Sequence, residues 1–281
     1  MSTEAPVTPK QIFAELSRDV IGQDEALRGM SVAIYKHLIG HSVGNVLMVG
    51  NSGTGKTTIM RAVERFYSTT RELAKHSTII RINANLVADL ASRGRQTILV
   101  LDRLARQAAS ILGESADVDT MREYVSHGIV CVDEVDKIRA QVGGEPSVKG
   151  IVAQDSLLTL MENENVQVEL PYFEAGSWHT LTTPINTEHV FFVAGGAFED
   201  LYDQVYLRVT QKSGSDRFWQ LVPRADGSLD RRCIFDLSRH MTQEYIFEYG
   251  MKPLFLSRLE NDVMMRDFIA TEMGRMFLYS L

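Results

Sequence analysis

Residues 50–57, Gly-Asn-Ser-Gly-Thr-Gly-Lys-Thr, combine residue types and a spacing that suit the binding of nucleotide phosphates. The pattern is that of a P-loop, whose backbone N–H groups surround the phosphates while its lysine and hydroxyl contact phosphate oxygens and Mg²⁺. An apolar run at 46–49 precedes it as a buried strand would, and 57–63 has the spacing of a helix. A chance glycine turn is the alternative, but such a turn does not require the Lys-Thr ending. The residues expected to bind the phosphates are Gly50, Asn51, Ser52, Gly53, Thr54, Gly55, Lys56, Thr57 and Thr58.

A pair of acids, Asp133 and Glu134, follows the apolar run at 128–132. In P-loop NTPases the first acid at such a place helps hold Mg²⁺, together with the P-loop hydroxyl, here Thr57. The second acid can orient and deprotonate a water molecule as a general base. Acid pairs also begin ordinary surface helices, but the apolar run in a chain with a P-loop favours the metal and base roles. Asp136 and Lys137 on the next turn either face a neighbouring subunit or, as we expect, begin a solvated helix.

The elements that must position these residues alternate along the chain. We expect strands at 46–49, 78–82, 128–132 and 190–194, the last ended by Gly195-Gly196. We expect helices at 9–19, 57–63, 97–112 and 151–161, and one that segment 20–26 leads into and that runs to about residue 39. Segments 166–170 and 179–181 alternate in the manner of a hairpin. Continuous apolar strands between helices predict an α/β fold with a mostly parallel sheet covered on both faces. Ligands of such sheets bind at the carboxyl ends of the strands, where the P-loop and the acid pair fall.

Composition limits the possible functions. The chain has 281 residues, 44% of them hydrophobic, and a formal net charge of −7, which argues against a broad nucleic-acid-binding face. No apolar run is long enough to cross a membrane, and the N-terminus has no signal pattern. Of the two cysteines, Cys131 lies in an apolar run, which indicates a buried free thiol and favours a reducing, cytoplasmic location.

The motifs, taken in order, resemble the AAA+ ATPases of the Clp/HslU branch, and most closely the ClpX type. The resemblance rests on Val20-Ile21-Gly22-Gln23, the P-loop, and the segments 128–138, 154–162, 191–198 and 250–259. It implies a P-loop NTPase fold and ATP with Mg²⁺ between the subunits of a ring, usually a hexamer. Val20 and Ile21 would pack near the adenine, Glu134 would activate water, and Lys56 would act on the phosphates. Arg258 matches the arginine finger that reaches into the next subunit's site, although by residue type alone it reads as a surface arginine.

Several segments depart from this family. The tip expected to line the pore reads Ala91-Ser92-Arg93-Gly94, without the aromatic residue that grips a threaded chain. Residues 205–236 show no Ile-Gly-Phe-type peptidase-docking loop; there Phe218 and Trp219 are either a partner anchor or, as we expect, buried beneath a loop. We expect no N-terminal zinc-binding module, and we expect the C-terminal helical lid to be largely absent. Residues 262–268 would supply a last strand and 273–281 one helix start, with Arg266 and Arg275 poor sensor candidates.

These observations lead to three hypotheses. The first is an ATP-hydrolysing remodeller of protein partners that forms a homo-oligomeric ring. The second is an ATP-gated assembly scaffold or regulatory switch, as a ring or an open filament, that threads no polypeptide. A peptidase-coupled unfoldase is the third. We expect residues 1–8 to form a flexible tail, 9–265 the AAA+ large domain, and 266–281 the start of a truncated lid.

Overall fold

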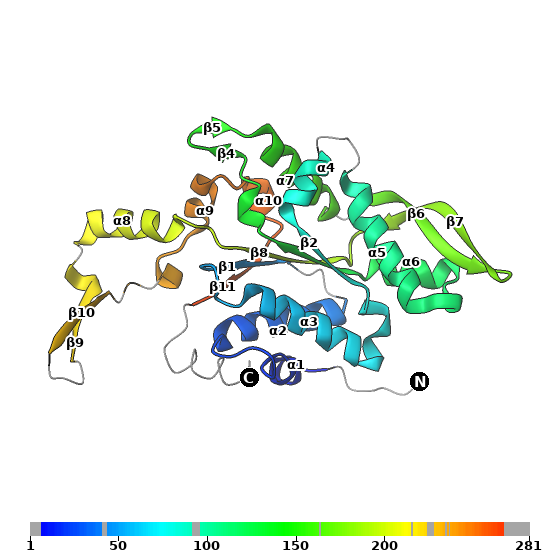
Figure 1. The fold of residues 1–281 in the computed structure, drawn as a ribbon, viewed down its shortest axis with the longest axis horizontal. Helices are drawn as coiled ribbons and strands as arrows, with labels where there is room; N and C mark the ends of the chain where they lie inside the picture. The colour runs from blue at the N-terminus through cyan, green and yellow to red at the C-terminus, as the bar shows by residue number, and fades with distance from the viewer. Residues whose placement is uncertain are drawn as a thin grey trace.

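The computed structural model describes residues 7–40, 44–91, 96–162, 164–214, 216–223, 228–233, 235 and 237–266. At its centre lies a five-stranded sheet in the order β11-β1-β8-β3-β2, with every neighbouring pair parallel (Figure 1). The strands are β1 (Val46–Val49), β2 (Ile79–Asn83), β3 (Ile129–Asp133), β8 (Phe191–Gly196) and β11 (Asn261–Met264). The α/β fold with a parallel sheet flanked by helices is therefore confirmed.

Helices cover both faces of this sheet (Figure 1). One face carries α1 (Pro9–Leu16), α2 (Asp24–Leu38) and α3 (Lys56–Thr69). The other carries α4 (Ala84–Ala91), α5 (Gln96–Leu112), α6 (Val118–Ser126), α7 (Val148–Leu160), α9 (Gln243–Tyr249) and α10 (Pro253–Leu256), with α8 (Leu201–Ser213) extending away from the sheet. The first helix ends three residues earlier than the expected 9–19, because 17–19 form a turn.

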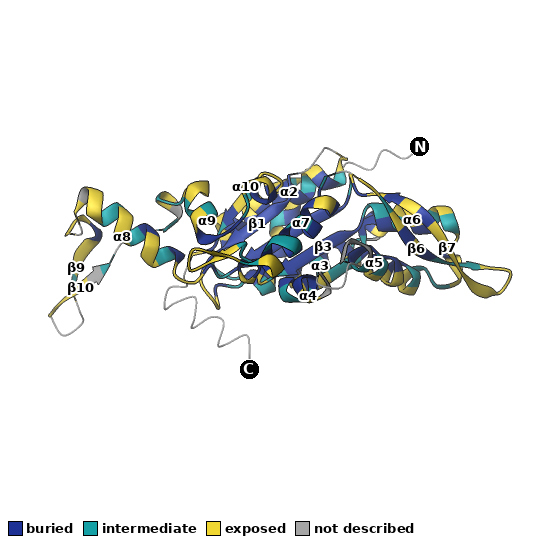
Figure 2. Ribbon diagram, turned by 90° about the horizontal axis from the view of Figure 1, so that it is seen from above, coloured by how far each residue is buried: buried dark blue, intermediate teal, exposed yellow. Residues whose placement is uncertain are grey.

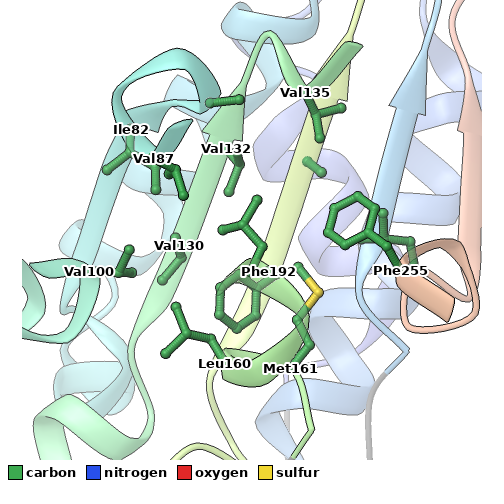
Figure 3. Packing of buried hydrophobic residues seen from close by; sticks show 14 of the residues in the cluster. Ile82, Val87, Val100, Val130, Val132, Val135, Leu160, Met161, Phe192 and Phe255 are labelled. Carbon is green, nitrogen blue, oxygen red and sulfur yellow. The ribbon is translucent and has the colours of Figure 1, made fainter. Parts of the chain in front are cut away.

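Alternation along the strands explains the two layers, since successive side chains of a strand point to opposite faces. The residues that face α1–α3 are Val46, Met48, Ile129, Cys131, Phe191 and Val193. Those that face α4–α7 are Leu47, Val49, Val130, Val132, Phe192 and Ala194. Figure 3 shows Phe192 beside Leu160 and Met161 of the second layer. Each such buried side chain contributes about 1.5–3 kcal/mol relative to an exposed one, so both layers hold the sheet firmly. Cys131 is a free, buried thiol as expected, and burial raises its pKa.

Strand β8 extends beyond the boundary that the sequence predicts. Gly195 and Gly196 do not end the strand but pair with β1 inside the sheet. A Cβ at Gly195 would lie 3.0 Å from Met60 Cε, and one at Gly196 would lie 2.6 Å from the ring of Phe198. The glycines are needed because neighbouring side chains approach the strand closely, and not because the chain turns there.

Two hairpins lie at opposite ends of the molecule (Figure 1). Strands β6 (Asn165–Glu174) and β7 (Ser177–Asn186) are longer than expected and are joined by a turn with Ala175 and Gly176 at positive φ. At the other end are β9 (Trp219–Pro223) and β10 (Leu229–Cys233), largely exposed in Figure 2. Phe218 is buried as expected, whereas Trp219 is 36% exposed, so only half of that expectation holds. A third, short hairpin pairs β4 (Gln141–Val142) with β5 (Glu145–Pro146). Within the described ranges no helix has the length and apolar content needed to cross a bilayer.

Four of the seven histidines gather at the amino edge of the sheet, where the strands begin. The ring centroids are 4.9 Å apart for His37 and His76, 5.3 Å for His76 and His127, and 5.2 Å for His127 and His189. His37 Nε2 donates to the carbonyl of His189 at 3.0 Å, which leaves Nδ1 to accept the hydroxyl hydrogen of Tyr67 at 3.0 Å. This neutral form of His37 satisfies both ring nitrogens. His76 Nδ1 is buried and has no hydrogen-bond partner among the described residues.

Substitution of Gly150 tests how tightly α7 lies on the segment after β3. A Cβ at Gly150 would lie 1.8 Å from the carbonyl oxygen of Arg139, so Gly150→Ala forces backbone apart and is expected to lower the free energy of unfolding by about 3 kcal/mol. Gly29→Ala in α2 is the matched control, because its Cβ would lie 3.4 Å from Val263 Cγ2, an ordinary contact. Alanine should stabilise that helix slightly. Urea unfolding measures both; equal stability of the two variants would contradict the close approach.

Candidate nucleotide-binding site

The P-loop joins the end of β1 to the start of α3. Gly53 and Gly55 have φ of 80° and 94°, and Gly55 is the cap residue from which α3 starts at Lys56. Glycine adopts this left-handed conformation without steric cost, which lets the loop present its backbone around an anion. Lys56 is 8% exposed, and its ammonium donates to the carbonyls of Gly50 (2.5 Å) and Asn51 (2.8 Å). Burial lowers the pKa of Lys56, while the carboxylates of Asp136 and Asp133 oppose that change.

A cavity of about 320 Å³ opens over the P-loop at the carboxyl edge of the sheet. It is lined by Ser52, Gly53, Gly55, Lys56, Thr57, Thr58, Asp133, Glu134, Asp136, Lys137, Ala197 and Glu199. Thr57 Oγ1 donates to Asp133 Oδ2 at 3.1 Å, which brings the two expected metal ligands together. Hydroxyl and carboxylate oxygens are the ligands that Mg²⁺ prefers, so this donor set fits the ion. The structure thus places Lys56, Thr57, Asp133 and Glu134 around one cavity.

Glu134 has a left-handed backbone, with φ 58° and ψ 38°. Non-glycine residues at positive φ carry strain that the surrounding structure must support. Two more such residues, Phe198 and Asp200, follow β8 and are sequence neighbours of Ala197 and Glu199, which line the same cavity. The Glu134 carboxylate accepts Asn83 Nδ2 at 2.7 Å and Asn85 Nδ2 at 3.4 Å. Asn83 ends β2, so the rule that placed the acid pair at a strand end could also have identified it.

Asp136 corrects the expectation of a solvated helix start. It is 1% exposed, and its Oδ1 accepts the backbone N–H of Ala197 at 3.1 Å. Its Oδ2 has no hydrogen-bond partner among the described residues. The burial depends on Ala197, which directly follows β8 and lies 61 residues away in the sequence, and local patterning does not reveal it. Lys137, next to it, is 41% exposed as expected.

The segment 20–23 is connected to the P-loop mainly by Gln23. Its side chain is 2% exposed and donates to the carbonyls of Thr54 (2.9 Å) and Arg266 (2.7 Å). A second cavity of about 240 Å³ lies beside the P-loop, lined by Gln23, Glu25, Gly50, Asn51, Tyr202, Phe235, Leu237, Met264, Met265 and Arg266. Val20 instead packs in the α1–α3 layer at 5% exposure, and neither Val20 nor Ile21 lines either cavity. No role for Gln23 was predicted from the sequence, although Gln23 belongs to the same motif, residues 20–23.

Arg258 lies at the opposite edge of the sheet from the P-loop. Its carbonyl accepts Asn45 Nδ2 at 3.0 Å, and Asn45 immediately precedes β1, whose other end is the P-loop. Its side chain is 43% exposed, and its guanidinium lies 3.7 Å from the Glu162 carboxylate. At about 3.3 Å per residue, the four residues of β1 separate the two edges by roughly 13 Å. The structure therefore does not bring Arg258 to the cavity of its own chain.

Comparison with known proteins places this arrangement in a family. Residues 41–261 match the AAA domain (Cdc48 subfamily). The chain is a member of the AAA domain family. Among curated proteins, this AAA domain is similar to the ATP-dependent Clp protease ATP-binding subunit ClpX of Bacteroides fragilis and of Porphyromonas gingivalis, each 27% identical over 268 residues. The corresponding subunit of Azotobacter vinelandii is 28% identical over 273 residues.

These matches cover 89% of this AAA domain chain but only 56–58% of the relatives, so the chain spans little more than half of their length. The expected resemblance to Clp-type ATPases is confirmed, as a distant one. Membership of the family implies ATP binding and hydrolysis. Several expected features lie outside the described residues: Ser92, Arg93 and Gly94, which were expected to line a pore, the end of the expected last strand beyond 266, and the expected helix start at 273–281 with Arg275.

Proposed function

We propose that this AAA domain hydrolyses ATP in an assembly of its own copies, at a site shared between two of them. One observation supports the sharing. The expected base Glu134 and the P-loop lie at the carboxyl edge of the sheet, whereas Arg258 lies exposed at the amino edge. An arginine so placed reaches a phosphate only if a second copy presents its carboxyl edge. The proposed domain spans 9–265, and 266–281 would begin a lid.

Within one copy, the proposed roles follow from the contacts. The amides of residues 51–57 and the Lys56 ammonium hold the phosphates once Lys56 gives up the carbonyls of Gly50 and Asn51. Thr57 and Asp133 would hold Mg²⁺, which when bound neutralises charge on the β- and γ-phosphate oxygens. Lys56 and Lys137 face four carboxylates in the cavity, those of Asp133, Glu134, Asp136 and Glu199. We therefore expect Mg²⁺ to assist binding as well as hydrolysis.

The reaction requires a base and a means of stabilising the transferring phosphoryl group. Glu134, oriented by Asn83, accepts a proton from the water whose oxygen attacks the γ-phosphorus. The bond from that phosphorus to the bridging β–γ oxygen breaks, and ADP and phosphate leave. Arg258 of the neighbouring copy stabilises charge on the equatorial oxygens, a role worth roughly 10³–10⁵ in rate.

We further propose that the assembly remodels a protein partner. The similarity to ClpX supports this, because those relatives are named as subunits of an ATP-dependent protease. A scaffold that uses ATP only for assembly is the second candidate, and the absence of an aromatic residue at 91–94 favours it. Substitution of Arg93 distinguishes them: a threading remodeller should lose remodelling with hydrolysis kept, whereas a scaffold should be unaffected.

Mixing two inactive variants tests the shared site. Glu134→Gln and Arg258→Ala each remove one half of every site in a uniform assembly, so each alone should hydrolyse ATP poorly. In a random equal mixture, about a quarter of the interfaces pair an intact Glu134 with an intact Arg258, and a corresponding share of activity should return. Phosphate release measures the recovery.

Two controls make the result decisive. A mixture of Glu134→Gln with Lys56→Ala should stay inactive, because every copy then lacks a residue of the same half-site. Arg18→Ala removes an exposed arginine that pairs with Glu15 at 2.6 Å, far from the cavity, and should leave activity unchanged. Failure of the first mixture to recover, with both variants shown to co-assemble, would show that Arg258 does not act across copies.

A further inference from the structure

Asp136 and Lys137 occupy the wall of the phosphate cavity without a role in the mechanism above. Both line the cavity together with Glu134, and the backbone N–H of Lys137 donates to the Glu134 carbonyl at 3.0 Å. A single 3-10 turn at 135–137, together with its cap residue Glu134, therefore carries the expected base and an ammonium group to the same cavity. Any charge that Lys137 brings there lies next to the hydrolysed end of a bound triphosphate, because the base must lie at that end.

The carboxylate of Asp136 is fixed in place. It is 1% exposed, and the Ala197 N–H holds its Oδ1 at 3.1 Å. A buried carboxylate is costly unless other groups compensate its charge. Its Oδ2 has no hydrogen-bond partner among the described residues, but the Lys137 ammonium lies 3.4 Å away. The buried carboxylate of Asp136 thus holds the Lys137 ammonium close to it.

The second contact of Lys137 is weak and replaceable. Glu199 Oε2 lies 3.8 Å from Lys137 Nζ, and the Glu199 side chain is 66% exposed. Exposed ion pairs of this kind contribute little free energy. A phosphate oxygen, which carries more charge and lies in a less hydrated cavity, competes well for the same ammonium. Glu199 therefore holds Lys137 at the cavity wall but offers little resistance to an exchange of partners.

We propose that Lys137 is a second phosphate-contacting cation of the same chain, positioned by Asp136, and that it selects a nucleoside triphosphate over a diphosphate. On binding, its ammonium leaves Glu199 for an oxygen of the terminal phosphate while it stays near Asp136. A diphosphate offers no oxygen at that place, and Lys137 then keeps its contact with Glu199. This inference rests on the proposed function, since it assumes that the cavity holds the phosphates of ATP.

Binding measurements without turnover test the proposal. The affinities of Mg²⁺-ADP and of the Mg²⁺ complex of the β,γ-imido analogue of ATP are measured by titration calorimetry. Lys137→Ala should weaken the analogue roughly three- to tenfold and leave ADP nearly unchanged. Lys137→Arg should restore most of the loss. Asp136→Asn keeps the acceptor for Ala197 and removes the charge, so the ratio of analogue to ADP affinity should fall even if both affinities shift.

The matched control is Lys75→Ala, which removes another exposed lysine that pairs with a glutamate, Glu123, at 3.8 Å, outside the cavity. It should change neither affinity. If Lys137→Ala weakens the binding of both nucleotides equally, the role of Lys137 is structural. If it weakens neither, the contact between Lys137 and Glu199 is only a surface ion pair. Either result overturns the proposal. If the unmodified protein binds neither nucleotide, or Lys56→Ala changes nothing, the proposed function itself fails instead.

Discussion

Replacing Glu134 by glutamine lowers kcat for ATP hydrolysis roughly 10²–10⁴-fold and leaves ATP bound, because an amide cannot take the proton from water. Glutamine keeps the size of the side chain and an oxygen that can accept the Asn83 Nδ2 hydrogen bond, now 2.7 Å long. The substitution therefore adds no strain to the backbone of residue 134, which has φ 58°. Phosphate release measures hydrolysis, and titration with ATP measures binding.

Two comparisons complete this experiment. Lys56→Ala should lose binding and hydrolysis together, because the buried ammonium is the cation nearest the P-loop carbonyls. Glu64, a neighbouring acid on α3 that does not line the cavity, provides the control as Glu64→Gln, which should behave as the unmodified protein does. Turnover that survives both Glu134→Gln and Lys56→Ala would refute the assignment of the site.

Acidification below pH 6.5 should destabilise the fold steeply through the histidine cluster. Burial lowers the pKa of His37 to about 3 and of His76 to about 2, with smaller opposing or reinforcing effects from neighbours. Both values lie below the 6.5 of an unfolded histidine. The stability that the neutral rings provide is therefore complete above about pH 6.5 and is lost as the pH falls towards 3. The cost is roughly 1.4 kcal/mol per histidine for each pH unit.

The charged and titratable groups around the histidine cluster also affect the pKa values of its rings. Lys75 adds positive charge near the rings of His37 and His76 and further disfavours their protonation. His127 and His189 act on these two rings in the same direction. Glu123 opposes this at His127, where burial nevertheless lowers the pKa. Tyr67, also buried, donates to His37 only while that ring nitrogen is neutral. Among the described residues, the His189 carbonyl that accepts from His37 Nε2 favours a proton on His37, but burial outweighs it.

Urea unfolding at pH 7.5, 6.5, 5.5 and 4.5 measures this dependence. His76→Phe keeps a ring of similar shape and removes both the titrating group and the unpartnered Nδ1, so it should reduce the slope by about half. His179→Gln on the exposed hairpin should leave the slope unchanged, since that histidine lies outside the cluster. A slope that is the same in all three proteins would show that other groups control acid unfolding.

Local patterns predicted the sheet strands and the P-loop well, because a continuous apolar run and a glycine-rich turn are encoded by adjacent residues. Asp136 was placed wrongly in solvent, since its burial depends on Ala197, which only the parallel pairing of β3 and β8 brings near. Gly195-Gly196 resembled a turn for a partly similar reason, since the Met60 side chain that approaches Gly195 comes from α3. The β6–β7 hairpin was predicted to be shorter than it is, because polar residues in its outer part obscure the alternation of apolar and polar residues.

If two copies share a site as proposed, the positions of Arg258 and the P-loop at opposite edges of the sheet make every contact between copies head-to-tail. A row of such copies always ends with one nucleotide site that receives no arginine and one arginine that serves no site. Closing the row removes both ends, so activity per copy should rise with protein concentration and level off only when closure or great length makes the ends negligible. With the proposed shared site, the specific activity for ATP hydrolysis would therefore report the degree of assembly, because the two halves of that site lie at the two ends of one short strand.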